Sequence, residues 1–471
     1  MTRINTNIAS LTALRHLSQA NANLNRSLER LSSGSRINHG SDDPAGLVIS
    51  ERLRAQIASL KQATENSQRA SNMVSTAEGA LDEMNNLLIS VKDLTLQASN
   101  SGAISADEVD ANQAQIDSAI SSVNRIANTT KFSSKRLLNG AQDYVLSTNT
   151  PLSALKDLHI FGLEFGTTSV KNIAIKMTTS AQLGTIGRVG KGMSAGSAIT
   201  LQVTGNKGTE VLTIGASTAN SGIVAAINAV KDSTGVSAIA STNLVNFYSR
   251  EFGKDQFVSV VDIDTDGNNT RFINARDIGQ DAVITVNGIK STTRGLEADL
   301  NTSGLKMHVK LQRALLLNVT KSFDVHGGGI KFQLGDTAAP NEQENLGIQN
   351  FNSTQLGISS EGFLNSIVTG GANDLRTNPS KAGRIIDGAI DQVSKLRARL
   401  GAFGKNTLQS NLNQLGVSIE NLSDAESRIR DTDFAQETAQ FTRSQILVQA
   451  GTSILAQANL TPQSVLQLLG R

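Results

Sequence analysis

The chain has 471 residues and a formal net charge of +2 at pH 7. This length allows roughly two to four domains, and the near-neutral charge gives no general electrostatic case for nucleic-acid binding. The chain contains no Cys and no Trp. Disulfides, thiolate metal sites and cysteine nucleophiles are therefore excluded. The cores must consist mainly of Leu, Ile, Val and Ala, which favours long paired helices.

Residues 1–40 predict a helix with one apolar face. Its apolar residues recur at spacings of three and four: Ile4, Ile8, Leu11, Leu14, Leu17, Ala20, Leu24, Leu28 and Leu31. The segment also holds five arginines against the single Glu29. These arginines either face solvent or meet an acidic neighbour in an assembly. No apolar signal region precedes the helix, so we expect no cleaved signal peptide and, for an extracellular protein, export by another route.

Residues 41–140 predict two further helices. Asp43 as N-cap with Pro44 at the first helical position begins the first of them. Its periodicity continues to about residue 99, which at 1.5 Å per residue gives a helix roughly 80 Å long. The sequence Asn100-Ser101-Gly102 ends it, and a second helix returns through Val109 to Ile126.

Residues 141–327 predict a β-rich region. Short runs of β-branched residues, separated by Gly and Asn turns, lie near residues 170–175, 199–203, 211–214, 258–263, 282–286 and 307–311. Residues 223–230 predict one helix within them. We interpret the region as one inserted domain or two small subdomains, placed where it disturbs no helical seam.

Residues 328–430 predict helices with a heptad-like seam, which runs through Ile386, Ile390, Val393, Leu396, Leu400, Phe403, Leu408, Leu412, Leu415, Ile419 and Leu422. Since an isolated helix would leave this seam in water, we expect it to pack against the helices of residues 44–128. The fold class is therefore mixed α and β: a long antiparallel coiled-coil rod from both ends of the chain, with an inserted β-rich domain.

Residues 431–471 predict a last helix of unusual composition. No charged side chain occurs from Ser444 to Gly470, yet five glutamines interrupt the apolar residues, so the segment is no membrane span. We expect Pro462 to break the helix before a final turn. Neither terminal helix could bury its stripe alone, which indicates a self-assembling polymer. The residues that we expect to carry assembly are Ile4, Ile8, Leu11, Phe434, Phe441, Val448, Leu455, Leu468 and Leu469.

Several sequence blocks near both termini resemble those of the bacterial flagellins. The N-terminal blocks are RINTN at 3–7, LSSGSRIN at 31–38 and DDPAGL at 42–47. The C-terminal blocks are SRIRDTDFA at 427–435, QIL at 445–447, QAGTS at 449–453, AQAN at 456–459 and LLGR at 468–471. A cytoplasmic coiled-coil scaffold would leave these blocks unexplained.

The resemblance implies a filament subunit with a layered organisation. Residues 1–40 and 431–471 would be the two halves of an inner core domain, 41–140 and 328–430 those of a rod domain, and 141–327 the variable surface domain. The subunit would be exported unfolded by the flagellar export apparatus, with an export chaperone, and would assemble outside the cell with itself, beneath a filament cap and above hook-junction proteins. The alternatives are a hook–filament junction protein, or a filament subunit whose middle domain adds an adhesive activity.

The resemblance also implies three positions for contact with a Toll-like innate immune receptor. Many flagellins carry an Arg four residues before a Leu on the long rod helix and a Glu on the returning helix. Here Leu94 fits, but Ser90 stands at the Arg position and Gln115 at the Glu position. Without these charges the strongest polar anchors are lost, so we expect weak or absent receptor activation.

The sequence contains no recognisable catalytic set, and we expect no enzyme activity and no cofactor. The alternating Asp262, Asp264 and Asp266 match the first half of a calcium loop, but Ile273 stands where the bidentate Glu belongs. We interpret this segment as a polar β-turn, with a weak Ca²⁺ site as the alternative.

Overall fold

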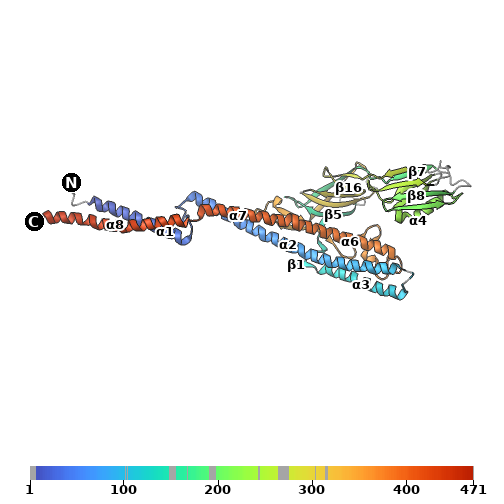
Figure 1. The fold of residues 1–471 in the computed structure, drawn as a ribbon, viewed down its shortest axis with the longest axis horizontal. Coiled ribbons are helices and arrows are strands. Elements are labelled where there is room, and N and C mark those ends of the chain that lie inside the picture. Colours follow the sequence, from blue (N-terminus) through green and yellow to red (C-terminus); the bar gives the residue numbers. More distant parts are fainter. Residues whose placement is uncertain are drawn as a thin grey trace. The chain divides into compact units, whose positions relative to one another are not determined.

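The computed structural model describes residues 7–100, 102, 104–147, 155–166, 168–189, 198–241, 244–263, 275–302, 304–312 and 317–469. The chain divides into two compact units. The first comprises Met1–Gln68, Leu334–Thr337 and Thr407–Arg471, and the second comprises Arg69–Gln333 and Ala338–Asn406. Helices occupy both ends of the chain and strands its middle (Figure 1). The predicted mixed fold class is confirmed.

The first unit contains the terminal helices α1 (Ile8–Ser33) and α8 (Phe434–Leu469). The Asn7 side chain caps α1 by accepting a hydrogen bond from Ser10 N–H (3.1 Å), and Gly34, with φ 69°, ends it. The expectation that Pro462 breaks the last helix is wrong, since α8 continues to Leu469. A proline at 462 cannot donate to the carbonyl of Ala458, and the Asn7 amide donates to that carbonyl instead (2.8 Å).

The rod helices are α2 (Pro44–Ser99), α3 (Ala106–Thr129), α6 (Pro379–Ala402) and α7 (Ser410–Arg430), with the π-helix η4 (Phe403–Gln409) joining the last two. Helix α2 begins and ends as predicted. Asp43 Oδ1 accepts from Gly46 N–H (2.9 Å) at its start, and the capping box of Ser105 and Glu108 starts α3.

The residues of the predicted seam are buried or half-buried in both units. In the first unit, Leu60 and Ala63 of α2 pack with Leu415 of α7. In the second, α2, α3 and α6 contribute long rows of fully buried residues, which include Leu81, Met84, Leu88, Val91, Ile116, Ile120, Val123, Ile386, Val393 and Leu400. Such rows at spacings of three and four are what bury the apolar faces of neighbouring helices.

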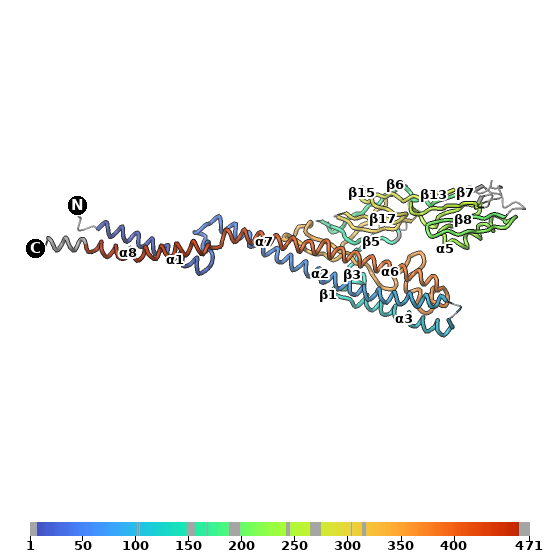
Figure 2. The backbone as a smooth tube through the Cα atoms, viewed as in Figure 1, coloured from blue at the N-terminus to red at the C-terminus, as the bar shows by residue number. Residues whose placement is uncertain are grey.

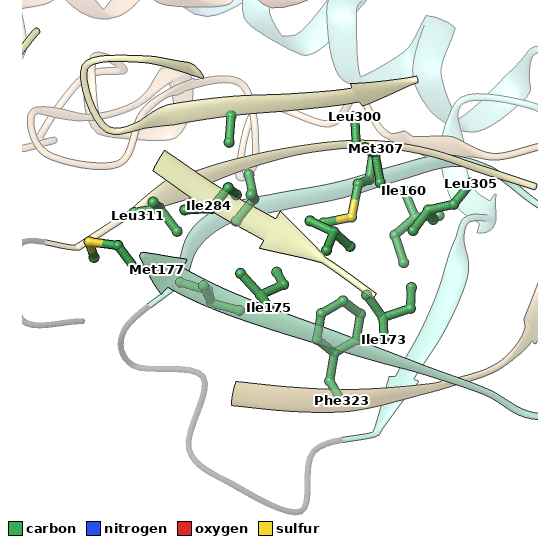
Figure 3. Close-up of a cluster of buried hydrophobic side chains, with 14 of the residues drawn as sticks. Ile160, Ile173, Ile175, Met177, Ile284, Leu300, Leu305, Met307, Leu311 and Phe323 are labelled. Carbon is green, nitrogen blue, oxygen red and sulfur yellow. The ribbon is translucent and has the colours of Figure 1, made fainter. Parts of the chain in front are cut away.

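The strands of the middle region form two hydrophobic cores within the second unit. A five-stranded sheet (order β15-β14-β6-β19-β4) and a four-stranded sheet (β16-β17-β18-β5) enclose the first core, which contains Ile173, Ile175, Ile284, Met307 and Phe323 (Figure 3). A four-stranded sheet (β13-β12-β8-β9), a three-stranded sheet (β10-β11-β7) and helix α4 enclose the second, around Leu201, Val203, Ile227 and Phe247.

The strands of these sheets have the following bounds: β4 Tyr144–Ser147, β5 Leu155–Leu163, β6 Lys171–Thr179, β7 Thr185–Val189, β8 Ile199–Gly205, β9 Thr209–Ile214, β10 Val236–Ser241, β11 Leu244–Ser249, β12 Phe257–Asp262, β13 Ala275–Ile278, β14 Val283–Val286, β15 Ile289–Lys290, β16 Thr292–Arg294, β17 Glu297–Asn301, β18 Leu305–Leu311 and β19 Thr320–Gly328. Two helices lie among them, α4 (Asn220–Ala229) and α5 (Lys231–Thr234). All pairings within the sheets are antiparallel.

Short hairpins connect the sheets to the rod helices. They are β1 (Lys131–Phe132) with β2 (Lys135–Arg136), β20 (Ile330–Gln333) with β21 (Gln343–Leu346), and β23 (Gly357–Ile358) with β24 (Gly362–Phe363). Strand β3 (Asn139–Gln142), which leads into the β-rich region, pairs with β22 (Ile348–Asn350), which leaves it. The short 3-10 helices η2 (Pro340–Glu342) and η3 (Leu364–Ser366) complete the return to α6.

Candidate assembly interface

Helices α1 and α8 lie side by side and run in opposite directions (Figure 2). Near one end Ser10 Oγ donates to Asn459 Oδ1 (2.8 Å), and near the other Arg30 pairs with Glu437 (3.6 Å). Buried and half-buried residues recur at alternating spacings of three and four on both helices. They are Ser10, Ala13, Leu17, Ala20, Leu24, Ser27 and Leu31 on α1, and Glu437, Phe441, Ser444, Val448, Gly451, Leu455 and Ala458 on α8. This is the seam of an antiparallel coiled coil.

Small residues fill alternate positions of this seam. Ala13, Ala20 and Ser27 are the buried residues of α1. On α8, Gly451 packs so closely that a Cβ added to it would lie 3.2 Å from Leu17 Cδ1. Since the side chains at a helix contact set the distance between the axes, these residues let the two helices approach closely. A narrow seam leaves many of the large apolar residues of both helices outside it.

Nine large apolar side chains on α1 and α8 are 47–62% exposed: Ile8, Leu11, Leu14, Leu28, Phe434, Ile446, Leu447, Ile454 and Leu460. Soluble monomers rarely expose so many large apolar groups on two paired helices, and concentrations of exposed apolar groups mark interaction surfaces. We call these nine residues the outward face. It is the candidate functional site of the molecule.

A polar junction connects the α1–α8 pair to the beginning of α2 and the end of α7. Ser35 forms a β-bridge with Asp431, and Arg36 donates its Nη2 to the carbonyl of Ile429 (2.7 Å). Arg430 pairs with Glu51 (2.6 Å), and the hydrogen bond from Arg430 lowers the pKa of the Glu51 carboxyl. Two N-terminal arginines, Arg30 and Arg36, thus have partners in the same chain, whereas Arg15 and Arg26 are exposed and form no ion pair within the described residues.

The residues predicted to carry assembly fall into three groups. Ile8, Leu11 and Phe434 belong to the outward face, while Phe441, Val448 and Leu455 lie in the seam against α1. Ile4 and the side chains of Leu468 and Leu469 lie outside the described residues. The assembly role of all nine stays a prediction.

Sequence reasoning missed several residues of the outward face. Leu14 and Leu28 were placed in the same stripe as Leu17 and Leu24, but the structure divides this stripe into an inward and an outward row. Ile446, Leu447 and Ile454 lie between the seam positions of α8, and Leu460 lies just beyond the last of them. One feature of the sequence could have predicted these residues: both helices contain more apolar residues than one heptad seam has positions for.

The three receptor-contact positions lie on rod helices of the second unit. Ser90 of α2 and Gln115 of α3 are exposed, and Leu94 is half-buried. The Ser90 hydroxyl donates to the carbonyl of Asn86 one turn earlier (3.1 Å). Both polar positions are accessible, and neither carries a charge.

The calcium candidate receives no support from the described residues. Asp262 is buried at the end of β12, and Asp264 and Asp266 lie outside the described residues. Among the residues that the structure describes, no group of three or more His, Cys, Asp or Glu could hold a metal ion. In the same part of the chain, no helix has the length and hydropathy needed to cross a membrane.

Comparison with known proteins gives three family matches. Residues 4–143 match the bacterial flagellin N-terminal helical region, residues 384–469 the bacterial flagellin C-terminal helical region, and residues 200–250 the flagellin hook IN motif. Polar flagellin F of Vibrio parahaemolyticus is 31% identical over 99% of both chains. Flagellin A of Vibrio cholerae is 32% identical, again over 99% of both chains.

Among solved structures, FliC from Burkholderia pseudomallei is 18% identical, covering 73% of this chain and 99% of that one, with a TM-score of 0.25. The flagellar junction protein FlgL from Legionella pneumophila is 13% identical, covering 82% of this chain and 100% of that one, with a TM-score of 0.28. The assignment to a family therefore rests on the family matches and on the related sequences, and not on these structures.

A chain with paired terminal helices, an outward apolar face and these family matches is a structural, self-assembling protein rather than an enzyme. It belongs to the bacterial flagellin family. It is a subunit of the flagellar filament, the extracellular structure that flagellins form for motility.

Proposed function

We propose that the outward face of α1 and α8 drives polymerisation, and that the terminal helices order fully only as subunits add. The closeness of the α1–α8 seam supports this, because small residues bury little apolar area within one chain. The large residues gain their burial from neighbouring subunits. Coupling order to assembly suits a chain that is exported unfolded.

The outward face supports an open polymer rather than a closed dimer. Its residues lie on both helices of the pair, from Ile8 and Leu11 to Ile454 and Leu460. Different patches on one subunit then meet different patches on its neighbours, and a heterologous contact that does not close produces a helical filament. In this arrangement residues 1–40 and 431–471 form the inner core, 41–140 and 328–430 the rod layer, and 141–327 the outer surface.

The uncharged stretch of α8 suits the wall of a central channel. From Ser444 to Leu460 the helix carries no charge, and Gln445, Gln449 and Gln457 are interspersed among its apolar residues. Their amides can hydrogen-bond with water or neighbouring helices, while unfolded subunits pass without ionic trapping. Gln449→Lys with Gln457→Lys would then shorten filaments in cells, and filaments of normal length would contradict the channel proposal.

The partners that follow are the export apparatus and an export chaperone before assembly, and the cap and hook-junction proteins at the two ends of the filament. Receptor activation by the monomer is expected to be weak, since Ser90 and Gln115 supply no charge at the contact positions. The single observation that carries the proposal is the outward face.

The assembly role of the outward face is tested by regrowing filaments from dissociated subunits. Filaments are dissociated by heat, cooled and examined by electron microscopy for regrowth, and the critical concentration is measured by sedimentation. Burial of one leucine contributes about 1.5–3 kcal/mol, so Leu14→Gln should raise the critical concentration roughly ten- to a hundredfold.

The matched control is Val211→Gln, because Val211 is similarly exposed (54%) but lies on β9 of the β-rich region. This variant should assemble like the parent chain. An unchanged critical concentration for Leu14→Gln would refute the assembly role of the outward face. Short rings in place of long filaments from the parent chain would indicate a junction protein.

A further inference from the structure

The second unit contains a cleft of about 1000 Å³ that the assembly proposal does not use. Residues of strands β5, β16, β17 and β18 line one side, and residues of helix α6 line the other. The lining combines charged side chains with the ring of Phe161 and the amide of Gln349. A concave site with a few convergent polar groups is the usual form of a small-molecule site.

Almost all the charges of this cleft are already paired. The pairs are Lys310 with Glu297 (2.8 Å), His308 with Asp299 (2.7 Å), Lys395 with Asp391 (2.7 Å), Arg294 with Asp255 (3.5 Å) and Lys254 with Asp281 (3.8 Å). The exception among the lining cations is Arg399 of α6, which forms no ion pair within the described residues. It is therefore the cation available to a ligand.

The guanidinium of Arg399 lies over the ring of Phe161, with its central carbon 3.0 Å from the ring centroid. Burial lowers the pKa of Arg399 to about 10, so the group still carries its charge at neutral pH. Stacking occupies one face of the guanidinium and leaves the N–H groups in its plane for acceptors. A partly desolvated cation is costly even with the Coulombic attraction of Asp299, and a bound carboxylate would offset that cost.

The backbone beside Phe161 is irregular. Strand β5 bulges opposite Val309, where the register with β18 shifts between His308 and Lys310. Within the bulge Asp157 adopts a φ of 47°, and Ser359 Oγ donates to its carboxylate (3.1 Å). Bulges change the direction in which side chains point, and they are common beside binding sites.

A second lining group also has no partner. The Oε1 atom of Gln349 is buried and accepts no hydrogen bond within the described residues. Buried polar atoms are nearly always paired, so an unpaired acceptor in a cleft calls for a donor from a ligand or water. The cleft thus offers a free donor, Arg399, and a free acceptor, Gln349.

We propose that this cleft binds a small hydroxylated monocarboxylate of the uronic-acid type. Its carboxylate would bind the fork of Arg399, and its hydroxyl groups would donate to Gln349 and to the lining carboxylates. The lining has five basic residues (Lys254, Arg294, Lys310, Lys395, Arg399) and five acidic ones (Asp157, Asp255, Glu297, Asp299, Asp391). This balance disfavours polyanions and suits a ligand with one negative charge and several hydroxyl groups.

The test is titration of the full-length monomer with glucuronate, followed by saturation-transfer NMR and calorimetry. Saturable binding is expected for glucuronate, with at least tenfold weaker binding of glucose, which lacks the carboxylate. Arg399→Met should reduce glucuronate binding at least tenfold. The control Arg384→Met removes a cation of the same helix α6 that is paired with Glu361 and does not line the cleft, and it should change binding less than threefold.

Several results would overturn the proposal: no saturable glucuronate binding, equal binding of glucose, tighter binding of inorganic phosphate, or unchanged binding by Arg399→Met. If Arg399→Met does not fold, Arg399→Gln tests the same charge. Filament regrowth should be normal for both variants, so failure of the cleft proposal and failure of the assembly proposal are distinguishable.

Discussion

The side chain of Gln113 on α3 is hydrogen-bonded to Leu375, which lies 262 residues further along the chain. Its Oε1 atom accepts from the backbone N–H of Leu375 (2.9 Å), and its Nε2 atom donates to the carbonyl of Ile367 (2.9 Å). Gln113 is 2% exposed. One buried amide therefore joins the returning N-terminal helix to the segment that leads into α6.

Gln113→Leu should destabilise the second unit markedly. The change leaves one buried N–H and one buried carbonyl without partners, which costs roughly 2–5 kcal/mol in the free energy of unfolding. Urea unfolding of the monomer, followed by circular dichroism, measures the loss. Gln115→Leu is the matched control, since Gln115 is exposed on the same helix, and its effect should stay within about 0.5 kcal/mol. Equal effects of the two substitutions would contradict the role of the buried amide.

Gly451→Val should weaken assembly by forcing the terminal helices apart. A Cβ at this position already lies 3.2 Å from Leu17 Cδ1, and overpacking of this kind costs about 1–3 kcal/mol. The critical concentration for regrowth should rise about tenfold or more. Gly416→Val on α7 is the control, because nothing lies within 4 Å of its added Cβ. If both variants regrow filaments at the same concentration, the close seam is not needed for assembly.

The stability of the second unit should fall in mild acid because of His159. Burial lowers the pKa of His159 to about 4, below its ordinary value of 6.5. Between pH 4 and pH 6.5 the unfolded chain therefore binds a proton at His159 that the folded chain does not bind. The contribution of the neutral ring to the free energy of unfolding is complete above pH 6.5 and is lost as the pH falls toward 4. His159→Gln should lose less unfolding free energy between pH 7.5 and 4.5 than the parent chain.

The control for this pH dependence is His326→Gln, because His326 is exposed on β19. Carboxylates titrate in the same range in all three proteins, so only the difference between the profiles reports on histidine. Parallel profiles for the parent chain and His159→Gln would argue against the half-buried ring of His159 being held neutral.

Ser90→Arg combined with Gln115→Glu should increase activation of a Toll-like receptor by the monomer. Both positions are exposed, so the new charges would be available for charge-assisted hydrogen bonds, which are the stronger ones in an interface. A reporter-cell assay should show weak activation by the parent chain and at least tenfold higher potency for the double variant. Asn86→Arg, one turn away on the same helix, should have no such effect. Potent activation by the parent chain would refute the prediction that the missing charges at Ser90 and Gln115 make activation weak.

Local signals in the sequence predicted the helices well. Asp43 and Pro44 determine where α2 begins, and their cap geometry depends only on neighbouring residues. The wrong prediction of a helix break at Pro462 arose because the relevant contact is not local. The carbonyl to which this proline cannot donate, that of Ala458, accepts a hydrogen bond from Asn7 at the other end of the chain, and no local rule contains that contact.

The candidate sites were less accessible to sequence reasoning. The stripe of α1 contains more apolar residues than one seam needs, so Leu17 and Leu14 were indistinguishable until α8 was in place. The cleft depends on Arg399 meeting Phe161 across a helix and a sheet, and neither residue belongs to a motif. Periodicity predicts which elements form, whereas tertiary packing determines which side chains are left without partners.

Because β3 pairs with β22, the β-rich region is an insertion whose first and last residues lie next to each other. Gln142 lies opposite Ile348, and Asn139 opposite Asn350, so the chain returns to the point where it left, a few ångströms away on the neighbouring strand. The rod helices therefore bear no geometric penalty for the length of chain between these strands. Tyr144 likewise lies opposite Gly328, so a foreign domain whose own ends lie close together could replace residues 145–327, which would make this subunit a carrier able to display cargo at every position along a polymer.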